Sequence, residues 1–502
     1  MKKVLTMVLA MCMVLAMSVT VFADTSVDVS KHTFEAYQIF SGTQATDGGA
    51  LGNVEWGTGV NSSALLAALK EDTTLGTDFA NCITAADVAN VVTGYESNSD
   101  KAEAFARLVD ANKTSTTTAI TENKISTPGY YLIVDTTDVA GKQDAKNLSL
   151  LAVSNTVTIA SKTSVPTVVK KVDDKNDSNT SEDNTTWQDS ADYDIGDSIP
   201  YQITATMGDL SAYKTYYVEF TDTMTHLTYV DKSVKVTIDG TDKTDAFTTS
   251  WNNDTKILTV KCADVIAQGA KTDSKIVVTY NATLDSDATI GSTGNPNTVY
   301  MEYSNNPNNS GNGTDKPETG KTPEDKNIVF TYKVDANKIT ADKAALAGAA
   351  FELQKQAADG TWSVVGIQNA TKGEDGKYTI TDATQTSFEW KGIDDGTYKI
   401  VEVITPAGYN TIADQVFTVA ATHETEADEP KLQSLSGTAA DGSVITLTAD
   451  MTAGSLTTDI VNQAGATLPT TGGMGTTLFY VLGTILVLGA GVVLVARRRM
   501  AR

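Results

Sequence analysis

The sequence contains little cysteine, and this shortage excludes a fold held together by disulfide bonds. Three of the 502 residues are cysteine. Cys12 lies in an apolar N-terminal segment, so Cys82 and Cys262 are the only thiols in the rest of the chain. They are far apart and belong to no paired-cysteine motif, so we expect no disulfide framework. Mechanical strength must come from large cores or from another kind of cross-link.

Histidine is equally scarce, and the usual motifs of catalysis are missing. His32, His226 and His423 are widely separated in the sequence. There is no zinc-type histidine pair, no phosphate-binding loop and no nucleophile elbow. We therefore expect a protein that is not an enzyme acting on a substrate of its own, with no metal site and no cofactor.

Positive charge is also in short supply. Lysine and arginine number 38 against 62 aspartate and glutamate residues, which gives a net charge of −24. Nucleic-acid binding requires a basic surface because phosphates are negative, so nucleic acid is excluded as a partner. An acidic surface of this kind favours solubility.

The N-terminus has the composition of an export signal. Lys2 and Lys3 precede an apolar run over 4–22, and small residues end at Ala23. Because the run is short and polar sequence follows at once, we expect a signal peptide (1–23) that is cleaved after Ala23.

The C-terminal region, 468–502, carries three signals in a fixed order. An apolar run over 476–496 is, at about 20 residues, long enough to cross a bilayer as a helix. Four arginines after it would hold the tail in the cytoplasm. The run is preceded by a pentapeptide made of Leu468, Pro469, Thr470, Thr471 and Gly472. Together the three parts resemble the cell-wall sorting signal of Gram-positive surface proteins, which is the substrate of sortases.

This resemblance implies a covalent reaction carried out on the chain. A sortase cysteine would attack the carbonyl of Thr471 and release Gly472 and everything after it. The acyl-enzyme would then pass the chain to an amine nucleophile. The resemblance places the protein on the surface of a Gram-positive cell, in the cell wall, with a transient membrane anchor before cleavage.

Runs rich in Val, Ile, Thr and Tyr, separated by polar turns, dominate the chain between these signals. Such a pattern is typical of antiparallel β-sandwiches. We expect an all-β protein of three tandem Ig-like sandwiches, over 24–162, 163–322 and 323–467. In the first, Thr84 and Asp87 form a capping-box pattern that predicts a helical insertion.

One stretch, 305–326, is nearly devoid of apolar residues and dense in Asn, Gly, Pro and Lys. It has the composition of an interdomain linker or a long surface loop.

Several motifs in the body of the chain resemble those of Gram-positive pilins. The segments 346–353, 396–409 and 458–462 resemble B-type collagen-adhesin domains, and 398–409 looks like the pilin E box. Four further segments resemble the major fimbrial shaft subunits: 36–42, 194–197, 220–224 and 297–306. The last three lie in the middle domain, which the resemblance makes A-type collagen-adhesin-like. The resemblance covers essentially the whole chain.

In that family, domains carry an internal Lys–Asn amide bond that forms without an enzyme. A buried lysine loses its charge, because desolvation disfavours the ammonium, and becomes a nucleophile. A buried carboxyl group stays protonated for the same reason, so it can polarise the asparagine carbonyl and move protons. Close packing supplies the geometry of attack, and ammonia leaves.

For the C-terminal domain the resemblance assigns Asn462 as the carbonyl partner and Glu402 as the acid. Two lysines compete for the amine. Lys333 is our choice because the family's lysine closes the first strand and runs into a Val-Asp pair, whereas Lys338 lies in a polar segment. Strand alternation is less favourable to Lys333, since it sets that residue opposite the face of Tyr332.

For the middle domain the opening strand supplies the amine. Period-two alternation puts Lys170 on one face with its apolar neighbours and Lys171 on the other, so Lys170 is our choice. Alternation likewise selects Asp222 as the acid. Asn297 is the expected partner, with Asn295 as an alternative. The first domain shows no comparable set, and we predict no bond there.

A shaft subunit also needs a lysine that accepts Thr471 of the next molecule. Family members present it in a pilin motif at the end of the first domain, and Lys162 occupies that place here, although its flanking residues depart from the motif. We therefore expect the major subunit of a covalent pilus, with sortase, further copies of itself, minor pilins and peptidoglycan as partners. The alternative is a monomeric, wall-anchored adhesin. The ligand of either is unknown from the sequence.

Overall fold

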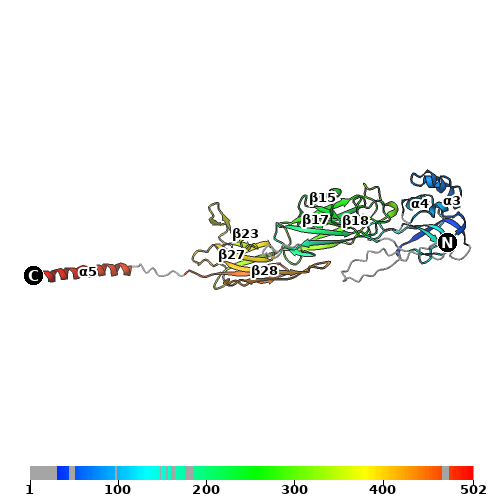
Figure 1. Cartoon of the computed structure of the whole chain (residues 1–502). Helices are drawn as coiled ribbons and strands as arrows, with labels where there is room; N and C mark the ends of the chain where they lie inside the picture. Colours follow the sequence, from blue (N-terminus) through cyan, green and yellow to red (C-terminus); the bar gives the residue numbers. More distant parts are fainter. Residues whose placement is uncertain are drawn as a thin grey trace, which may run out of the picture.

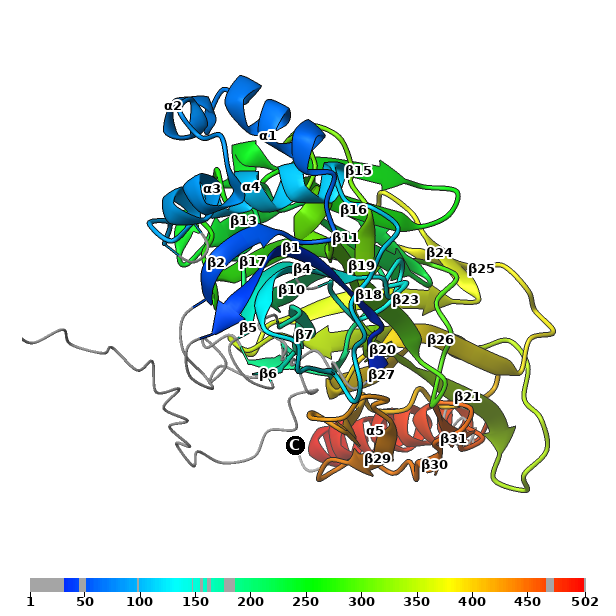
Figure 2. The same cartoon turned by 90° about the vertical axis from the view of Figure 1, so that its right-hand side faces the viewer.

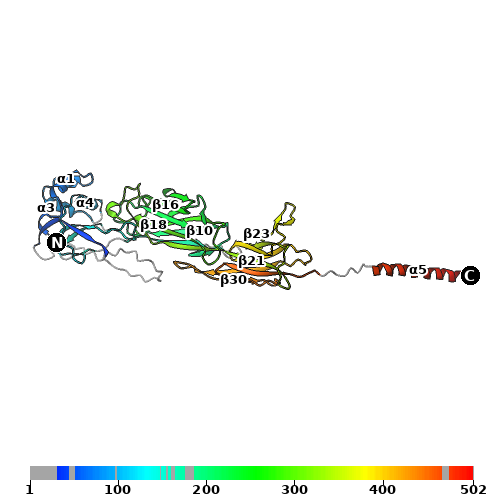
Figure 3. The same cartoon turned by 180° about the vertical axis from the view of Figure 1, so that it is seen from behind.

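The structure is a computed structural model that describes residues 31–44, 51–96, 99–146, 148–153, 157–159, 164–175, 186–465 and 474–500. The predicted signal cleavage at Ala23, the acceptor Lys162 and the pentapeptide 468–472 lie outside the described residues. Three bodies rich in β-structure follow one another along an elongated molecule (Figures 1 and 3). The N-terminal body alone carries a group of helices, which gather on one side of its sheet when the molecule is viewed end-on (Figure 2).

The N-terminal domain is a four-stranded sheet covered by helices. The sheet has the order β2-β1-β4-β5, made of Leu51–Trp56, Phe34–Gln44, Gly129–Asp135 and Leu148–Val153. A two-stranded sheet pairs β3 (Lys124–Ile125) with β6 (Val157–Thr158). The helices α1 to α4 lie between β2 and β3 in the chain and span Ser62–Glu71, Gly76–Phe79, Ala85–Val92 and Asp100–Ala111. The predicted helical insertion is therefore confirmed.

Local sequence explains where these helices begin. Thr84 and Asp87 form the reciprocal capping box expected before α3. Ser99 caps α4 through its hydroxyl. The helices bury Leu65, Phe79 and Phe105 against one face of the sheet, so the insertion is part of the domain core.

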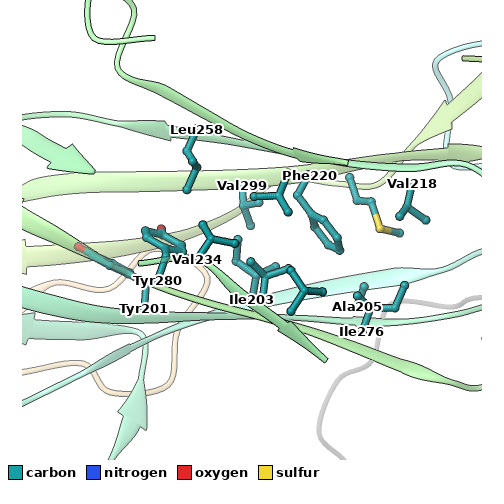
Figure 4. Close-up of a cluster of buried hydrophobic side chains, with 14 of the residues drawn as sticks. Tyr201, Ile203, Ala205, Val218, Phe220, Val234, Leu258, Ile276, Tyr280 and Val299 are labelled. Carbon is teal, nitrogen blue, oxygen red and sulfur yellow. The ribbon is translucent and has the colours of Figure 1, made fainter. Parts of the chain in front are cut away.

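The middle domain is a sandwich of two seven-stranded sheets. One sheet has the order β14-β13-β17-β10-β7-β8 with β12 on β17, and the other β15-β16-β11-β18-β20-β9 with β19 on β18. Alternate residues point inward, as expected for strands buried on one face. Tyr201, Ile203 and Tyr280 from the first sheet face Phe220 and Val299 from the second (Figure 4).

The first sheet contains β7 (Thr167–Asp173), β8 (Trp187–Gln188), β10 (Ser198–Thr206), β12 (Leu227–Tyr229), β13 (Lys235–Ile238), β14 (Thr241–Asp242) and β17 (Lys275–Leu284). The second sheet contains β9 (Ser190–Asp192), β11 (Val218–Met224), β15 (Thr248–Asn252), β16 (Ile257–Cys262), β18 (Asn295–Ser304), β19 (Thr319–Lys321) and β20 (Asp325–Phe330).

The polar stretch 305–326 lies against the middle domain. Its strand β19 pairs with β18, and its residues Asn305 and Thr322 are buried. The chain then enters β20, which still belongs to the middle sheet. Strand pairing therefore passes from the middle to the C-terminal domain at Thr331, beyond residue 322.

The C-terminal domain is a second sandwich, of a four-stranded and a five-stranded sheet with the orders β26-β21-β31-β30 and β23-β22-β27-β28-β29, and β24 and β25 form a separate hairpin. Its first strand β21 pairs in parallel with its last strand β31. The strands β21 to β31 span Tyr332–Thr340, Ala350–Gln356, Trp362–Gln368, Ala370–Lys372, Tyr378–Ile380, Ser387–Ile393, Gly396–Ile404, Gln415–His423, Leu432–Ala439, Thr448–Asp450 and Ser455–Asn462.

The last described element is the helix α5, Met474–Met500. Its segment Tyr480–Arg499 has a mean hydropathy of 2.0 and none of it is buried, so it is long and apolar enough to cross a membrane. The predicted class, all-β domains followed by an apolar C-terminal helix, is confirmed.

Candidate functional site

The middle domain holds a lysine that is completely shielded from solvent. Lys170 lies on β7 with its side chain between the two sheets, and its exposed fraction is 0%. Its Nζ donates to Asp222 Oδ2 at 2.7 Å and to the Tyr280 hydroxyl at 2.7 Å. Asp222 comes from β11 of the opposite sheet and is equally buried. The predicted amine and the predicted acid are therefore in direct contact.

The predicted asparagine completes this cluster through a tyrosine. Asn297, on β18, donates from Nδ2 to the Tyr280 hydroxyl at 2.9 Å. Tyr280 in turn donates to Asp222. The Asn297 Oδ1 is buried without a hydrogen-bond partner among the described residues. Lys170 and Asn297 thus both contact the Tyr280 hydroxyl. The Asn297 side-chain oxygen remains available to a group that could polarise its carbonyl.

Burial of Lys170 favours the uncharged form of its amine. Burial lowers the pKa of Lys170, because removing the ammonium from water outweighs the attraction of Asp222. A lysine with a lowered pKa is more often the neutral amine, which is the nucleophilic form.

The alternatives in the middle domain lie elsewhere. Lys171 faces outward and pairs with Asp189 and Glu426 at 2.8 and 2.7 Å. Asn295 is buried, but it bonds to the backbone of Thr289 through both its side-chain oxygen and its nitrogen. The alternation along β7 therefore places Lys170, and not Lys171, between the two sheets.

The C-terminal domain holds a second buried cluster with the same three residue types. Lys338 Nζ donates to Asn462 Oδ1 at 2.6 Å. The Asn462 Nδ2 donates to the two oxygens of Glu402 at 2.9 and 3.1 Å. Lys338 and Asn462 are fully buried, and Glu402 is 7% exposed. The asparagine therefore lies between the amine and the carboxyl group.

The surroundings of this cluster hold the acid in place and favour the neutral amine. Glu402 Oε2 also accepts hydrogen bonds from the Ile412 backbone N–H at 3.0 Å and from the Thr405 hydroxyl at 3.2 Å. Desolvation lowers the pKa of Lys338 to about 8. A substantial share of this lysine is then deprotonated near neutral pH.

Our choice of Lys333 as the amine of this domain has to be corrected. Lys333 is partly exposed and pairs with Glu389 at 2.7 Å and Asp335 at 3.0 Å, and these carboxylates raise its pKa. It does not reach Asn462. The strand β21 continues to Thr340, so the segment taken for a polar turn is a strand, and alternation turns Lys338 inward.

Comparisons with known proteins agree with this architecture. Residues 332–431 match the prealbumin-like fold domain of the SpaA family, and residues 460–501 match the LPXTG cell-wall anchor motif. The trypsin-resistant surface T6 protein of Streptococcus pyogenes serotype M6 is 30% identical over 275 residues, which is 44% of this chain and 48% of that protein. The matched segment thus spans about half the length of this relative.

The solved T6 backbone pilin of serotype M6 S. pyogenes, described as a modular three-domain structure, has a similar fold. The TM-score is 0.51 at 17% identity, and the match covers 87% of this chain and 97% of that one. The chain thus shares a prealbumin-like domain, a cell-wall anchor motif and an overall fold with a Gram-positive backbone pilin. These findings support the predicted relation to the pilins, and the predicted wall anchor is confirmed.

In this chain the two matched regions meet at the C-terminal cluster. Lys338 and Glu402 lie within the prealbumin-like domain, and Asn462 lies at the start of the anchor region. The cluster therefore closes the last folded domain immediately before the wall-sorting signal. Nothing from the comparisons bears on the individual residues, so their chemistry rests on the geometry.

Tyr280 is the residue that sequence reasoning missed. It stacks on Tyr201 at 5.3 Å between ring centroids, and its hydroxyl contacts all three members of the middle cluster. Alternation along β17 would have placed Tyr280 in the core, but no pattern in the sequence shows which core tyrosine meets the lysine.

Proposed function

We propose that this chain is the repeating subunit of a covalently polymerised pilus, and that its two buried clusters close internal amide bonds, Lys170 to Asn297 and Lys338 to Asn462. The observation that carries the second part is the 2.6 Å contact between Lys338 Nζ and Asn462 Oδ1 beside Glu402 in a buried site.

In the C-terminal domain the neutral amine of Lys338 attacks the side-chain carbonyl carbon of Asn462. A bond forms between Nζ and that carbon, and the bond from the carbon to Nδ2 breaks. Glu402 already accepts hydrogen bonds from Nδ2, so it is placed to return the proton lost by the lysine to the leaving nitrogen. The products are a secondary amide and ammonia.

In the middle domain the proton follows a longer route. Asp222 contacts Lys170, whereas Asn297 is reached through the Tyr280 hydroxyl. Asp222 takes the proton from the amine, Tyr280 passes its hydroxyl proton to the leaving Asn297 nitrogen, and Asp222 returns the proton it took to Tyr280. This again forms one amide bond and releases one ammonia molecule.

These bonds lie where a polymer under tension needs them. Force that enters through Lys162 reaches Lys170 on β7, crosses to Asn297 on β18 and continues through β20 into β21. From Lys338 on β21 it crosses to Asn462 on β31 and leaves toward Thr471. The amide bonds thus bypass most of each sandwich, so neither domain has to unfold when the pilus is pulled.

Intact-protein mass tests the internal bonds. The full chain should lack two ammonia molecules, and Lys170→Ala and Lys338→Ala should each restore one. Lys333→Ala is the matched control and should restore none. A wild-type mass with no loss would refute both bonds.

Wall extracts test the polymer. A sortase-assembled pilus, with minor pilins and a peptidoglycan attachment, should give a ladder of high-mass species that Lys162→Ala abolishes. Lys175→Ala, at an exposed lysine just after the middle domain's first strand, serves as the control and should leave the ladder intact. A single wild-type band would favour a monomeric adhesin instead.

A further inference from the structure

Three side chains of the kinds that bind metal ions meet where the middle and C-terminal domains touch. Asp174 follows β7, Asp192 ends β9, and His423 ends β28 of the other domain. One potential metal-binding atom from each lies within 4.8 Å of the other two. Because the three come from separate segments of two domains, no spacing in the sequence predicts the cluster, and the sequence led us to expect no metal site.

The hydrogen bonds of His423 fix which ring nitrogen faces the cluster. Ser190 Oγ lies 2.6 Å from the Glu424 carbonyl oxygen and 2.7 Å from His423 Nδ1. A carbonyl can only accept, so the single hydroxyl proton goes to Glu424, and Ser190 must accept a proton from Nδ1. In the neutral ring Nε2 then carries the lone pair, and it lies 3.5 Å from Asp174 Oδ2. An outer oxygen that orients an imidazole in this way is typical of histidine metal ligands.

Two buried polar atoms beside the cluster have no hydrogen-bond partner among the described residues. They are the Asp192 Oδ2 and the Tyr332 hydroxyl, and both residues are at least nine-tenths buried. Leaving such atoms unpaired is costly, so each calls for an explanation. The Tyr332 hydroxyl lies against the Asp192 carboxyl, which places it at the cluster.

The cluster also has an excess of negative charge. The carboxyl groups of Asp174 and Asp395 both lie near that of Asp192. Asp174 is additionally held by Gln188, whose Nε2 donates to Oδ2 at 2.6 Å. Two oriented carboxylates and an imidazole nitrogen that can offer its lone pair are thus held together.

We propose that Asp174, Asp192 and His423 bind one divalent first-row transition-metal ion, such as Zn²⁺, across the contact between the two domains. Nitrogen and oxygen ligands together suit zinc, whereas calcium takes oxygen ligands alone. Three protein ligands leave one position of a tetrahedral site for water or Asp395. The ion pairs the orphaned Asp192 oxygen and joins the domains without a disulfide.

A protonated His423 paired with Asp174 is the competing arrangement. It satisfies the imidazole and leaves the Asp192 carboxyl with the neighbouring Tyr332 hydroxyl. The two arrangements differ in an observable way, because only the metal site binds zinc stoichiometrically.

Calorimetric titration of the metal-stripped full chain with zinc chloride, in detergent, tests the proposal. One zinc ion should bind per chain. Asp192→Asn and His423→Gln should weaken binding by more than about 100-fold, and Ser190→Ala, which removes only the orienting oxygen, by about 10- to 100-fold. His226→Gln is the matched control: that histidine lies at a turn and pairs with Asp287, so its loss should leave zinc affinity unchanged.

The proposal is overturned if the wild-type chain binds no zinc, if Asp192→Asn binds it as tightly as wild type, or if calcium binds as tightly as zinc. Asp192→Asn keeps the shape of the side chain, so it remains informative should His423→Gln fail to fold. Circular dichroism of each variant checks that its sheets are intact.

Discussion

Lys338 and Asn462 contact each other at 2.6 Å although 124 residues separate them in the chain. The parallel pairing of β21 with β31 brings them together, because it sets Lys338 opposite Ile460 and Thr340 opposite Asn462. The first and last strands of the C-terminal domain are therefore neighbours, and an amide bond between them would enclose the whole sandwich.

Lys338→Ala should destabilise the C-terminal domain strongly. A cross-link that closes a loop of this length removes unfolded-state entropy worth about 5 kcal/mol, by analogy with a disulfide. The melting temperature of that domain should fall by roughly 10–20 °C. Differential scanning calorimetry on the full chain measures the shift.

Lys333→Ala provides the comparison for this loss. Lys333 is a partly exposed member of surface ion pairs, and such pairs contribute at most about 1 kcal/mol. An equal drop in melting temperature for both variants would show that the effect of Lys338→Ala does not come from the cross-link.

The rate of bond formation in the C-terminal domain should depend on pH. The folded-state pKa of Lys338 is lowered to about 8 from 10.5, and only the neutral amine attacks. The rate should therefore rise with pH below 8 and level off above it. Chain recovered in denaturant before the bond forms can be refolded at a series of pH values, and ammonia loss followed by mass.

The lowered pKa of Lys338 also determines how the stability of the domain changes with pH before the amide bond forms. Between about pH 8 and 10.5 the unfolded chain binds more protons at this lysine than the folded chain does, so the uncross-linked domain gains stability as pH rises through that window. Asn462→Ala, which cannot form the bond, should show this rise. A rate and a stability that both ignore pH would contradict the buried neutral amine.

Tyr280→Phe should slow bond formation in the middle domain without removing the lysine, acid or asparagine. Its hydroxyl is the only described contact that joins Asn297 to Lys170 and Asp222. Loss of such a proton-transfer group typically costs a factor of about 100 or more. Mass measured against time after refolding gives the rate.

Tyr229→Phe is the matched control, since this ring packs on Tyr280 at 6.4 Å between centroids and belongs to no contact of the cluster among the described residues. It should form the bond at the wild-type rate. If both variants are slowed alike, aromatic packing rather than the Tyr280 hydroxyl controls the reaction.

Many strands, helix starts and buried positions of this protein can be predicted from the sequence, because they depend on patterns among neighbouring residues. Alternation along β7 placed Lys170 in the core, and the capping box at Thr84 placed the start of α3. The choice between Lys333 and Lys338 failed for a different reason. Resemblance to a family motif was given more weight than alternation, although alternation along β21 puts Lys338 on the buried face and Lys333 on the other.

Contacts between distant segments could not be predicted in the same way. Tyr280 meets Lys170 because β17 and β7 flank β10 in one sheet at a particular register. Asp192 meets His423 because two domains touch. Neither relationship leaves a signal in the spacing of residues. The sequence therefore predicted the residue types of the internal clusters better than their full membership.

The contact between the middle and C-terminal domains depends on a glycine, and its substitution should separate the domains. Gly392 has a φ of +76°, and a Cβ there would lie 2.3–2.7 Å from three side-chain atoms of Ile195 in the middle domain. Next to it, the Ile195 backbone N–H donates to the Gly392 carbonyl at 3.0 Å, and Lys355 pairs with Asp194 at 2.7 Å across the contact. Gly392→Ala should push Ile195 away and weaken these bonds together.

Gly376→Ala separates this effect from backbone strain. Gly376 has almost the same φ, +77°, but its Cβ would meet nothing within 4 Å. Both alanines adopt a left-handed conformation at a cost of roughly 1–2 kcal/mol, whereas only Gly392→Ala also disrupts the contact. Small-angle scattering should show a broader range of interdomain angles for Gly392→Ala alone. Identical scattering for the two variants would mean that the contact at Ile195 does not hold the domains together.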